Sequence, residues 1–233
     1  MARDVARAGA IAGWLLLGGI LILEVAIPSL IAGQPLSGTD DAAVVAGHFA
    51  HPELTTLVAL DFLLVLPLVI FAVALRQVLA TVDDARFLAT VGLAFMVIEA
   101  PLILAQFALQ GTLVSLATAE GAVMPLFRLW DLVYNGAVYA VEAGLVVAFG
   151  LAARAHPAFP RWLPGAALVV GALQIINIGG VFGWIPSGLT LIGNVGFAIW
   201  LAATSFGLTR AARTGPSVLT APTVPTGSPA ATG

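Results

Sequence analysis

Residues 87–109 have the sequence FLATVGLAFMVIEAPLILAQFAL, in which Glu99 is the only ionisable residue. In an α-helix, 23 residues extend about 35 Å at 1.5 Å per residue, enough to cross a hydrocarbon layer of ~30 Å. The apolar residues are continuous rather than alternating, which favours a helix over a strand of a membrane barrel. The stretch therefore predicts a transmembrane helix.

Five further stretches of the 233-residue chain have the same character. The six predicted spans cover residues 10–31, 54–75, 87–109, 131–152, 163–182 and 189–208. The first follows a basic flank like that of a signal peptide, but it is longer than a signal-peptide core and contains Glu24, so we interpret it as a retained span. Residues 1–209 are predicted to form an all-α, polytopic bundle of six transmembrane helices. Residues 210–233, rich in Thr, Pro, Ser, Gly and Ala, are typical of a disordered tail.

Composition supports this fold class and excludes several kinds of site. The chain is 60% hydrophobic and 9% charged, with a mean hydropathy of +1.05, whereas about a quarter of the residues of a soluble domain are charged. Cysteine is absent, which excludes disulfides, iron–sulfur clusters and thiolate metal sites within the chain. The basic residues form no single patch, so we expect a lipid bilayer as partner and no nucleic acid. There is no P-loop, so the chain is not expected to use a nucleotide as its energy source.

The basic residues indicate the orientation of the bundle. All nine are arginines, and eight flank the predicted spans on one side: Arg3, Arg7, Arg76, Arg86, Arg154, Arg161, Arg210 and Arg213. Only Arg128 lies on the other side, where we expect it to pair with Asp131. Because short cytoplasmic loops retain arginine and lysine, the bias predicts that both termini are cytoplasmic and that the protein resides in the plasma (inner) membrane.

The longest predicted outer loop, residues 33–53, contains a segment with helical character. Residues 40–51 are expected to form a short amphipathic helix capped by an aspartate. His48 and His51 are three residues apart near acidic groups, but this spacing is a weak metal pattern and we favour a solvated loop. All three histidines fall in loops, so paired intramembrane haem ligation is unsupported. We predict no metal site and no cofactor.

Polar side chains within the spans are the best indicators of function, because each costs free energy in a bilayer. They lie in the central and outer parts of the spans, which predicts a polar cavity open to the outer side. The candidate ligand-binding residues are Glu24, Asp61, Glu99, Gln106, Asp131, Asn135, Glu142, Gln174, Asn177 and Asn194.

The fourth span has two distinct faces by helical spacing. Asp131, Asn135, Val138 and Glu142 follow an i, i+4, i+7, i+11 pattern and should form one stripe, which is polar apart from Val138. Gly136, Ala140, Gly144 and Ala148 repeat every four residues on the opposite face, as in small-residue seams between membrane helices. We therefore expect this span to be the most enclosed of the six.

These residues leave three functions open. A binding or transport protein would hold a small polar or amphipathic ligand in the cavity. A membrane-embedded enzyme would use paired carboxyl groups as acid and base on a lipid-like substrate such as an isoprenoid. In an accessory subunit, the polar groups would only join helices by hydrogen bonds.

Three short motifs carry a family resemblance. They are Arg7-Ala8-Gly9, the segment from Val91-Gly92 to Ile98-Glu99-Ala100, and residues 160–165 with the sequence PRWLPG. With them, residues 5–210 resemble a family of bacterial six-pass integral membrane proteins known as a domain of unknown function. The resemblance implies the fold and the membrane location. The family pattern has an arginine shortly before the glutamate of the third span, where this chain has apolar residues, so no ion pair at Glu99 is implied.

Overall fold

The computed structural model describes residues 2–33, 36, 40–117, 122–185 and 188–214, and every regular element within them is a helix. In chain order the elements are α1 (Ala2–Gly19), η1 (Ile20–Ala26), α2 (Ile27–Ala32), α3 (Ala42–Phe49), α4 (Glu53–Leu79), α5 (Asp83–Leu116), α6 (Val123–Asp131), η2 (Leu132–Val138), α7 (Tyr139–Ala153), α8 (Leu163–Val181) and α9 (Gly188–Thr214). The segments η1 and η2 are π-helical and continue the helices on either side of them.

Six helical units are long and apolar enough to cross a membrane. The first combines α1, η1 and α2, and the fourth combines α6, η2 and α7. The predicted all-α bundle is therefore confirmed, and the chain is a multi-pass membrane protein. Many large apolar side chains on its outer surface are exposed, Leu30 and Phe87 among them, as expected for helices that face lipid.

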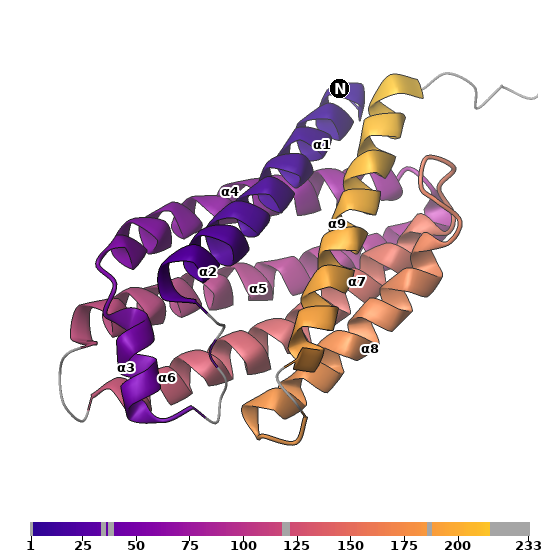
Figure 1. The fold of residues 1–233 in the computed structure, drawn as a ribbon. Coiled ribbons are helices and arrows are strands. Elements are labelled where there is room, and N and C mark those ends of the chain that lie inside the picture. Colours follow the sequence, from indigo (N-terminus) through magenta and orange to yellow (C-terminus); the bar gives the residue numbers. More distant parts are fainter. Residues whose placement is uncertain (1, 34–35, 37–39, 118–121, 186–187, 215–233) are drawn as a thin grey trace, which may run out of the picture.

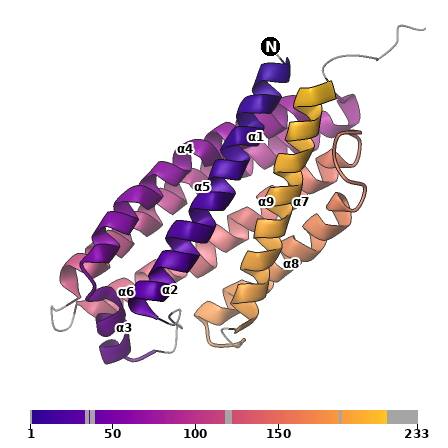
Figure 2. The ribbon, with the colours of Figure 1, turned by 45° about the horizontal axis from the view of Figure 1, so that its top comes forward.

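The helices form a closed ring in which neighbours in sequence are neighbours in space (Figures 1 and 2). Helix α1 packs against α4, α4 against α5, α5 against α7, α7 against α8, and α8 against α9. The ring closes because α9 packs against α1. Short connections make successive helices antiparallel, so they pack beside one another without long crossings. Helices α1 and α9 are adjacent near the N-terminus and diverge toward the opposite end of the bundle (Figure 1).

The helices extend beyond the predicted spans, which mark only the apolar part of each. The third span was predicted at residues 87–109, whereas α5 covers Asp83–Leu116. The predicted tail began at residue 210, but α9 continues to Thr214. Arg213 lies in the last turn of α9, where a cation interacts favourably with the helix dipole, so polar residues did not end the helix. The rest of the tail, residues 215–233, lies outside the described residues.

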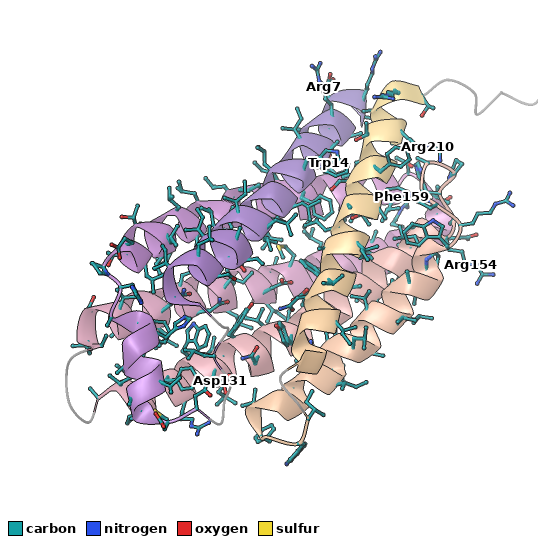
Figure 3. The ribbon with its side chains drawn as sticks, viewed as in Figure 1. Arg7, Trp14, Asp131, Arg154, Phe159 and Arg210 are labelled. Carbon is teal, nitrogen blue, oxygen red and sulfur yellow. The ribbon has the colours of Figure 1, made fainter. Side chains whose placement is uncertain are left out.

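Arg7, Arg154 and Arg210 lie at one end of the bundle, which we call the arginine end (Figure 3). Asp131 lies at the opposite end. The half of the bundle near the arginine end has an apolar core formed by all six units. Small residues allow close contact in this half: a Cβ atom at Gly13 in α1 would collide with Ser205 of α9 and with the ring of Phe71.

A second apolar cluster closes the opposite end, where α3 packs against α6. Val45 and Phe49 of α3 are buried in it. The side chain of Asp41 caps α3 by accepting hydrogen bonds from the backbone N–H groups of Ala43 (3.0 Å) and Val44 (2.9 Å). The predicted short helix with an aspartate cap is thus confirmed, at Ala42–Phe49.

Candidate functional site

A layer of polar side chains lies between the two apolar clusters. Every one of the six helical units contributes at least one residue to it. The members of this polar layer are Glu24, Asp61, Glu99, Tyr134, Tyr139, Glu142, Gln174, Asn177 and Asn194. Along α4, for example, Leu57 of the second apolar cluster precedes Asp61, and Leu68 of the arginine-end core follows it.

Helices α7, α8 and α9 meet at the most extensively hydrogen-bonded part of the layer. Gln174 donates from Nε2 to Glu142 Oε1 (2.7 Å), and Asn177 donates from Nδ2 to Gln174 Oε1 (3.2 Å). Gly193 of α9 lies against the two amides, and a Cβ atom there would overlap Asn177. The glycine thus lets the amide side chains pack directly on the α9 backbone.

Four carboxyl groups form the other part of the layer. Glu142 interacts electrostatically with Glu99 and Glu24, and Glu24 interacts with Asp61. Glu99 is 2% exposed and Asp61 is 3% exposed. Within the described residues, Glu99 Oε2 and Asp61 Oδ1 accept no hydrogen bond. Buried polar atoms are rarely left without a partner, so these two oxygens require an explanation.

Two tyrosines that the sequence patterns did not single out connect the layer to α9. Tyr134 and Tyr139 share a side-chain hydrogen bond, and Tyr139 OH donates to Asn194 Oδ1 (2.8 Å). Tyr139 also interacts electrostatically with Glu142 and Glu24. A signal was present, because the chain has only two tyrosines and both fall in the fourth span. A buried tyrosine hydroxyl needs a hydrogen-bond partner.

Both π-helical segments lie at the layer. Glu24 is part of η1, and Tyr134 and Asn135 are part of η2. A π-helical turn bonds residue i to i+5 and therefore shifts the faces of the helix on either side of it; such turns occur frequently at functional sites. In both units the irregular turn coincides with the polar side chains.

The residues of the predicted stripe on the fourth span have different partners in the structure. Asn135 Nδ2 donates to Asp131 Oδ1 (2.6 Å), and Arg128 interacts electrostatically with Asp131, as expected. Glu142 instead bonds to Gln174 in the polar layer. The spacing assumed an uninterrupted α-helix, whereas η2 separates Asp131 from Glu142. Asp131 and Asn135 form a pair of their own, nearer the end of the bundle opposite the arginine end.

The prediction that the fourth span is the most enclosed of the six is confirmed. The predicted seam of small residues on this span is partly correct. In its most apolar stretch 61% of residues are buried, against 44% in the next most buried unit. Gly144 lies against the ring of Phe95 in α5, but Ala140 is exposed and a Cβ at Gly136 would touch only Leu132 of its own unit. Gln106 is buried on α5, two turns beyond Glu99.

The described residues contain no group of three or more histidine, aspartate or glutamate side chains arranged to hold a metal ion. His48 lies on α3, outside the membrane-spanning helices, where burial and neighbouring His51 lower its pKa. Burial also lowers the pKa of His156 in the connection between α7 and α8.

Comparisons with models of protein families, with curated proteins and with solved structures found no match to this chain. The function of the polar layer must therefore be inferred from its geometry.

Proposed function

We propose that this protein binds a small polar or amphipathic ligand that carries a positive charge, and that the polar layer is the binding site. The observation that supports it best is the gathering of four carboxyl groups whose described electrostatic partners include no basic side chain. Uncompensated charge is costly in a low-dielectric interior. Either protons or a bound cation must therefore balance these groups.

The arrangement fits an organic cation better than a bare metal ion. Metal ions are held by several oxygens at 2.0–2.6 Å, and the described carboxyl groups do not converge in that way. They are instead distributed over four helices, with the amides of Gln174 and Asn177 beside them. A ligand with an ammonium group and an apolar part would satisfy Glu99 Oε2 and Asp61 Oδ1 while filling space between helices.

We place the entrance on the outer side or in the outer leaflet. The second apolar cluster closes the end of the bundle on that side, so a lateral route through the outer leaflet is the better fit. In Figure 1, α9 separates from α1 in the direction of the layer. Glu24 on η1 is only half-buried, so it is the carboxyl group best placed to meet an incoming ligand.

A membrane-embedded enzyme is the second candidate. Glu99 and Glu142 interact electrostatically, but Glu142 accepts a hydrogen bond from Gln174 while Glu99 Oε2 accepts none. Two carboxyl groups with different surroundings are the usual basis for an acid and a base on one site. A lipid-like substrate, such as an isoprenoid, would suit the location.

The binding proposal can be tested with a matched pair of lipophilic ions on purified protein in detergent. Tetraphenylphosphonium and tetraphenylborate have similar size and opposite charge. We expect the cation to bind at least about tenfold more tightly than the anion, as measured by isothermal titration calorimetry. Protons compete with the cation for the carboxyl groups, so its affinity should fall as the pH is lowered.

The double variant Glu99→Gln/Glu142→Gln supplies the control, because it keeps the shape of the layer and removes two charges. It should lose the preference for the cation while retaining the elution volume of the folded protein. Equal binding of both ions, or an undiminished preference in the double variant, would contradict the proposal. In that case an accessory role, in which the polar groups only join helices, becomes the better account.

We propose further that the arginine end and both termini face the cytoplasm, in the plasma membrane of a bacterium, as the family resemblance and the arginine bias predict. The native chain has no cysteine, so single cysteines can be introduced without background. Ala43 on α3 and Ala155 between α7 and α8 are both exposed. In intact cells an impermeant thiol reagent should label Ala43→Cys and not Ala155→Cys; the reverse result would invert the topology.

A further inference from the structure

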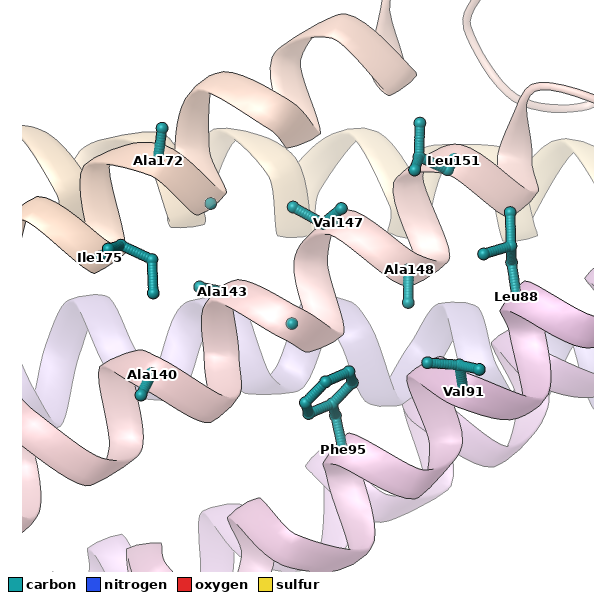
Figure 4. A pocket seen from close by; sticks show the side chains of 12 residues that line it. Leu88, Val91, Phe95, Ala140, Ala143, Val147, Ala148, Leu151, Ala172 and Ile175 are labelled. Atoms are coloured by element: carbon teal, nitrogen blue, oxygen red, sulfur yellow. The ribbon is translucent and has the colours of Figure 1, made fainter.

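An apolar groove runs along the outside of the bundle between α5, α7 and α8 (Figure 4). It has a volume of about 540 Å³, and its described lining consists entirely of apolar residues and glycine. Leu88 and Leu151 lie at one end, and Ala140 and Ile175 lie toward the other. Small residues on α7 and α8, with Phe95 behind them, leave the space that forms the groove.

The groove leads to an arginine. On α7 its lining residues Ala140, Val147 and Leu151 share one helical face, and Arg154 continues that face three residues beyond Leu151. Arg154 is exposed, and within the described residues no carboxylate forms an ion pair with it. Arg161 and the exposed Trp162 lie just before α8 at the same end of the bundle.

The length of the groove matches one leaflet of a bilayer. From Ala140 to Leu151 the α7 helix rises about 16 Å at 1.5 Å per residue. Half of a hydrocarbon layer of ~30 Å is about 15 Å. Arg154 then lies at the depth of the lipid headgroups, where tryptophan side chains such as Trp162 are also favoured.

We propose that this groove is a binding site for an anionic phospholipid from the leaflet at the arginine end. One acyl chain occupies the groove, and Arg154 binds the phosphate, with Arg161 adding positive charge nearby. The acyl chain contributes little binding free energy by itself, because it is also surrounded by apolar groups when it lies elsewhere in the bilayer. The charge of the headgroup therefore decides which lipid is retained.

A second copy of the chain fits the groove less well. Copies in one membrane have the same orientation, so a symmetric dimer through this face would have its two-fold axis along the membrane normal. The two Arg154 side chains would then lie at the same depth on either side of the axis. Like charges at an interface oppose association, whereas a phosphate neutralises them.

The test uses delipidated protein to which phosphatidylglycerol or phosphatidylcholine with identical acyl chains is added. Native mass spectrometry should show retention of phosphatidylglycerol several-fold above phosphatidylcholine, and the thermal midpoint should rise more with phosphatidylglycerol. Arg154→Gln should abolish this preference. Arg7→Gln is the matched control, because Arg7 is an exposed arginine at the same end but on α1, and it should leave the preference intact.

A second variant tests the acyl-chain part of the site. Ala172 lines the groove and is exposed, so Ala172→Phe fills the groove without entering the core. It should reduce retention of phosphatidylglycerol while the protein remains folded. Equal retention of the two lipids by the native chain, or equal loss in Arg154→Gln and Arg7→Gln, would overturn the proposal. So would a native dimer that Ala172→Phe converts to a monomer, since the groove would then be an interface between copies.

Discussion

The arginine-end core and the polar layer are held together in different ways, although the same six helical units pass through both. In the core, small residues bring helices into contact and aromatic rings fill the remaining space, as Gly13 and Phe71 do between α1, α4 and α9. In the polar layer, hydrogen bonds connect α7 and α8, while Glu99 and Asp61 each have a buried oxygen that accepts no hydrogen bond from the described part of the chain. The core also contains a buried polar atom without a described partner, Nε1 of Trp200. The atoms without described partners in the layer are instead carboxyl oxygens, whose burial costs more free energy, and this distinguishes the layer from a packing interface.

If close packing stabilises the core, a large residue at a helix contact should have a greater effect than any change in the polar layer. Gly150 of α7 has no room for a Cβ, which would collide with Ala167 of α8 and lie 3.6 Å from its Cα. The Cβ of an alanine is fixed by the backbone and cannot turn aside as the end of a flexible side chain can, so Gly150→Leu should destabilise by about 3 kcal/mol or more. We expect a large loss of folded protein on size-exclusion chromatography in detergent.

The control for this change lies on the partner helix. Gly165 of α8 is exposed, and a Cβ there would meet nothing within 4 Å. Gly165→Leu should therefore leave the elution profile unchanged. If Gly165→Leu and Gly150→Leu behave alike, close packing between α7 and α8 is not what stabilises this half of the bundle.

Within the polar layer, the comparison predicts effects of opposite sign. Glu99 has an unpartnered buried oxygen, so Glu99→Met should raise stability by about 1–3 kcal/mol, the usual cost of an unsatisfied buried group. Gln174 bonds to both Glu142 and Asn177, so Gln174→Leu should lower stability by a similar amount. The thermal midpoint of each variant in detergent, without added ligand, measures both.

Stability and binding should separate in these variants. Glu99→Met should be more stable than the native chain and should lose its preference for tetraphenylphosphonium, as expected where a site is maintained at the expense of stability. A loss of stability in Glu99→Met would mean that Glu99 has a structural role in joining helices, and the polar layer would then resemble the core after all.

The sequence was sufficient for the features that depend on composition. The apolar stretches predicted the six helices, the aspartates at the start of residues 40–51 predicted a capped helix there, and the enclosure of the fourth unit followed from its residues. Most members of the polar layer were also predicted, because ionisable and amide residues are rare in such spans.

The features that the sequence did not predict depend on irregular backbone and on contacts distant in sequence. No residue pattern marks η2 as π-helical, so the stripe from Asp131 to Glu142 was assigned on regular spacing. Tyr139 was missed because its role depends on Asn194, 55 residues further along the chain. The contact of Gly193 with Asn177 likewise exists only once α8 and α9 pack together.

The smallest expected effect lies outside both regions, in the connection between α7 and α8 at the arginine end. His156 Nδ1 accepts a hydrogen bond from the backbone N–H of Ala158 (3.2 Å), and burial lowers the pKa of His156 from its usual 6.5. The folded state therefore favours neutral His156, and its stabilising contribution is complete above pH 6.5 and is lost as the pH falls below that value. His156 is partly exposed, so solvent screens the effect, and we expect the thermal midpoint to fall by no more than about 2 °C between pH 7.5 and pH 5.5 from this group.

Asparagine can accept the same backbone hydrogen bond without titrating in this range, so His156→Asn should remove this part of the pH dependence and keep the midpoint at pH 7.5. If the variant keeps the whole pH dependence, another group that titrates in this range, such as His48 on α3, determines how the bundle responds to acid.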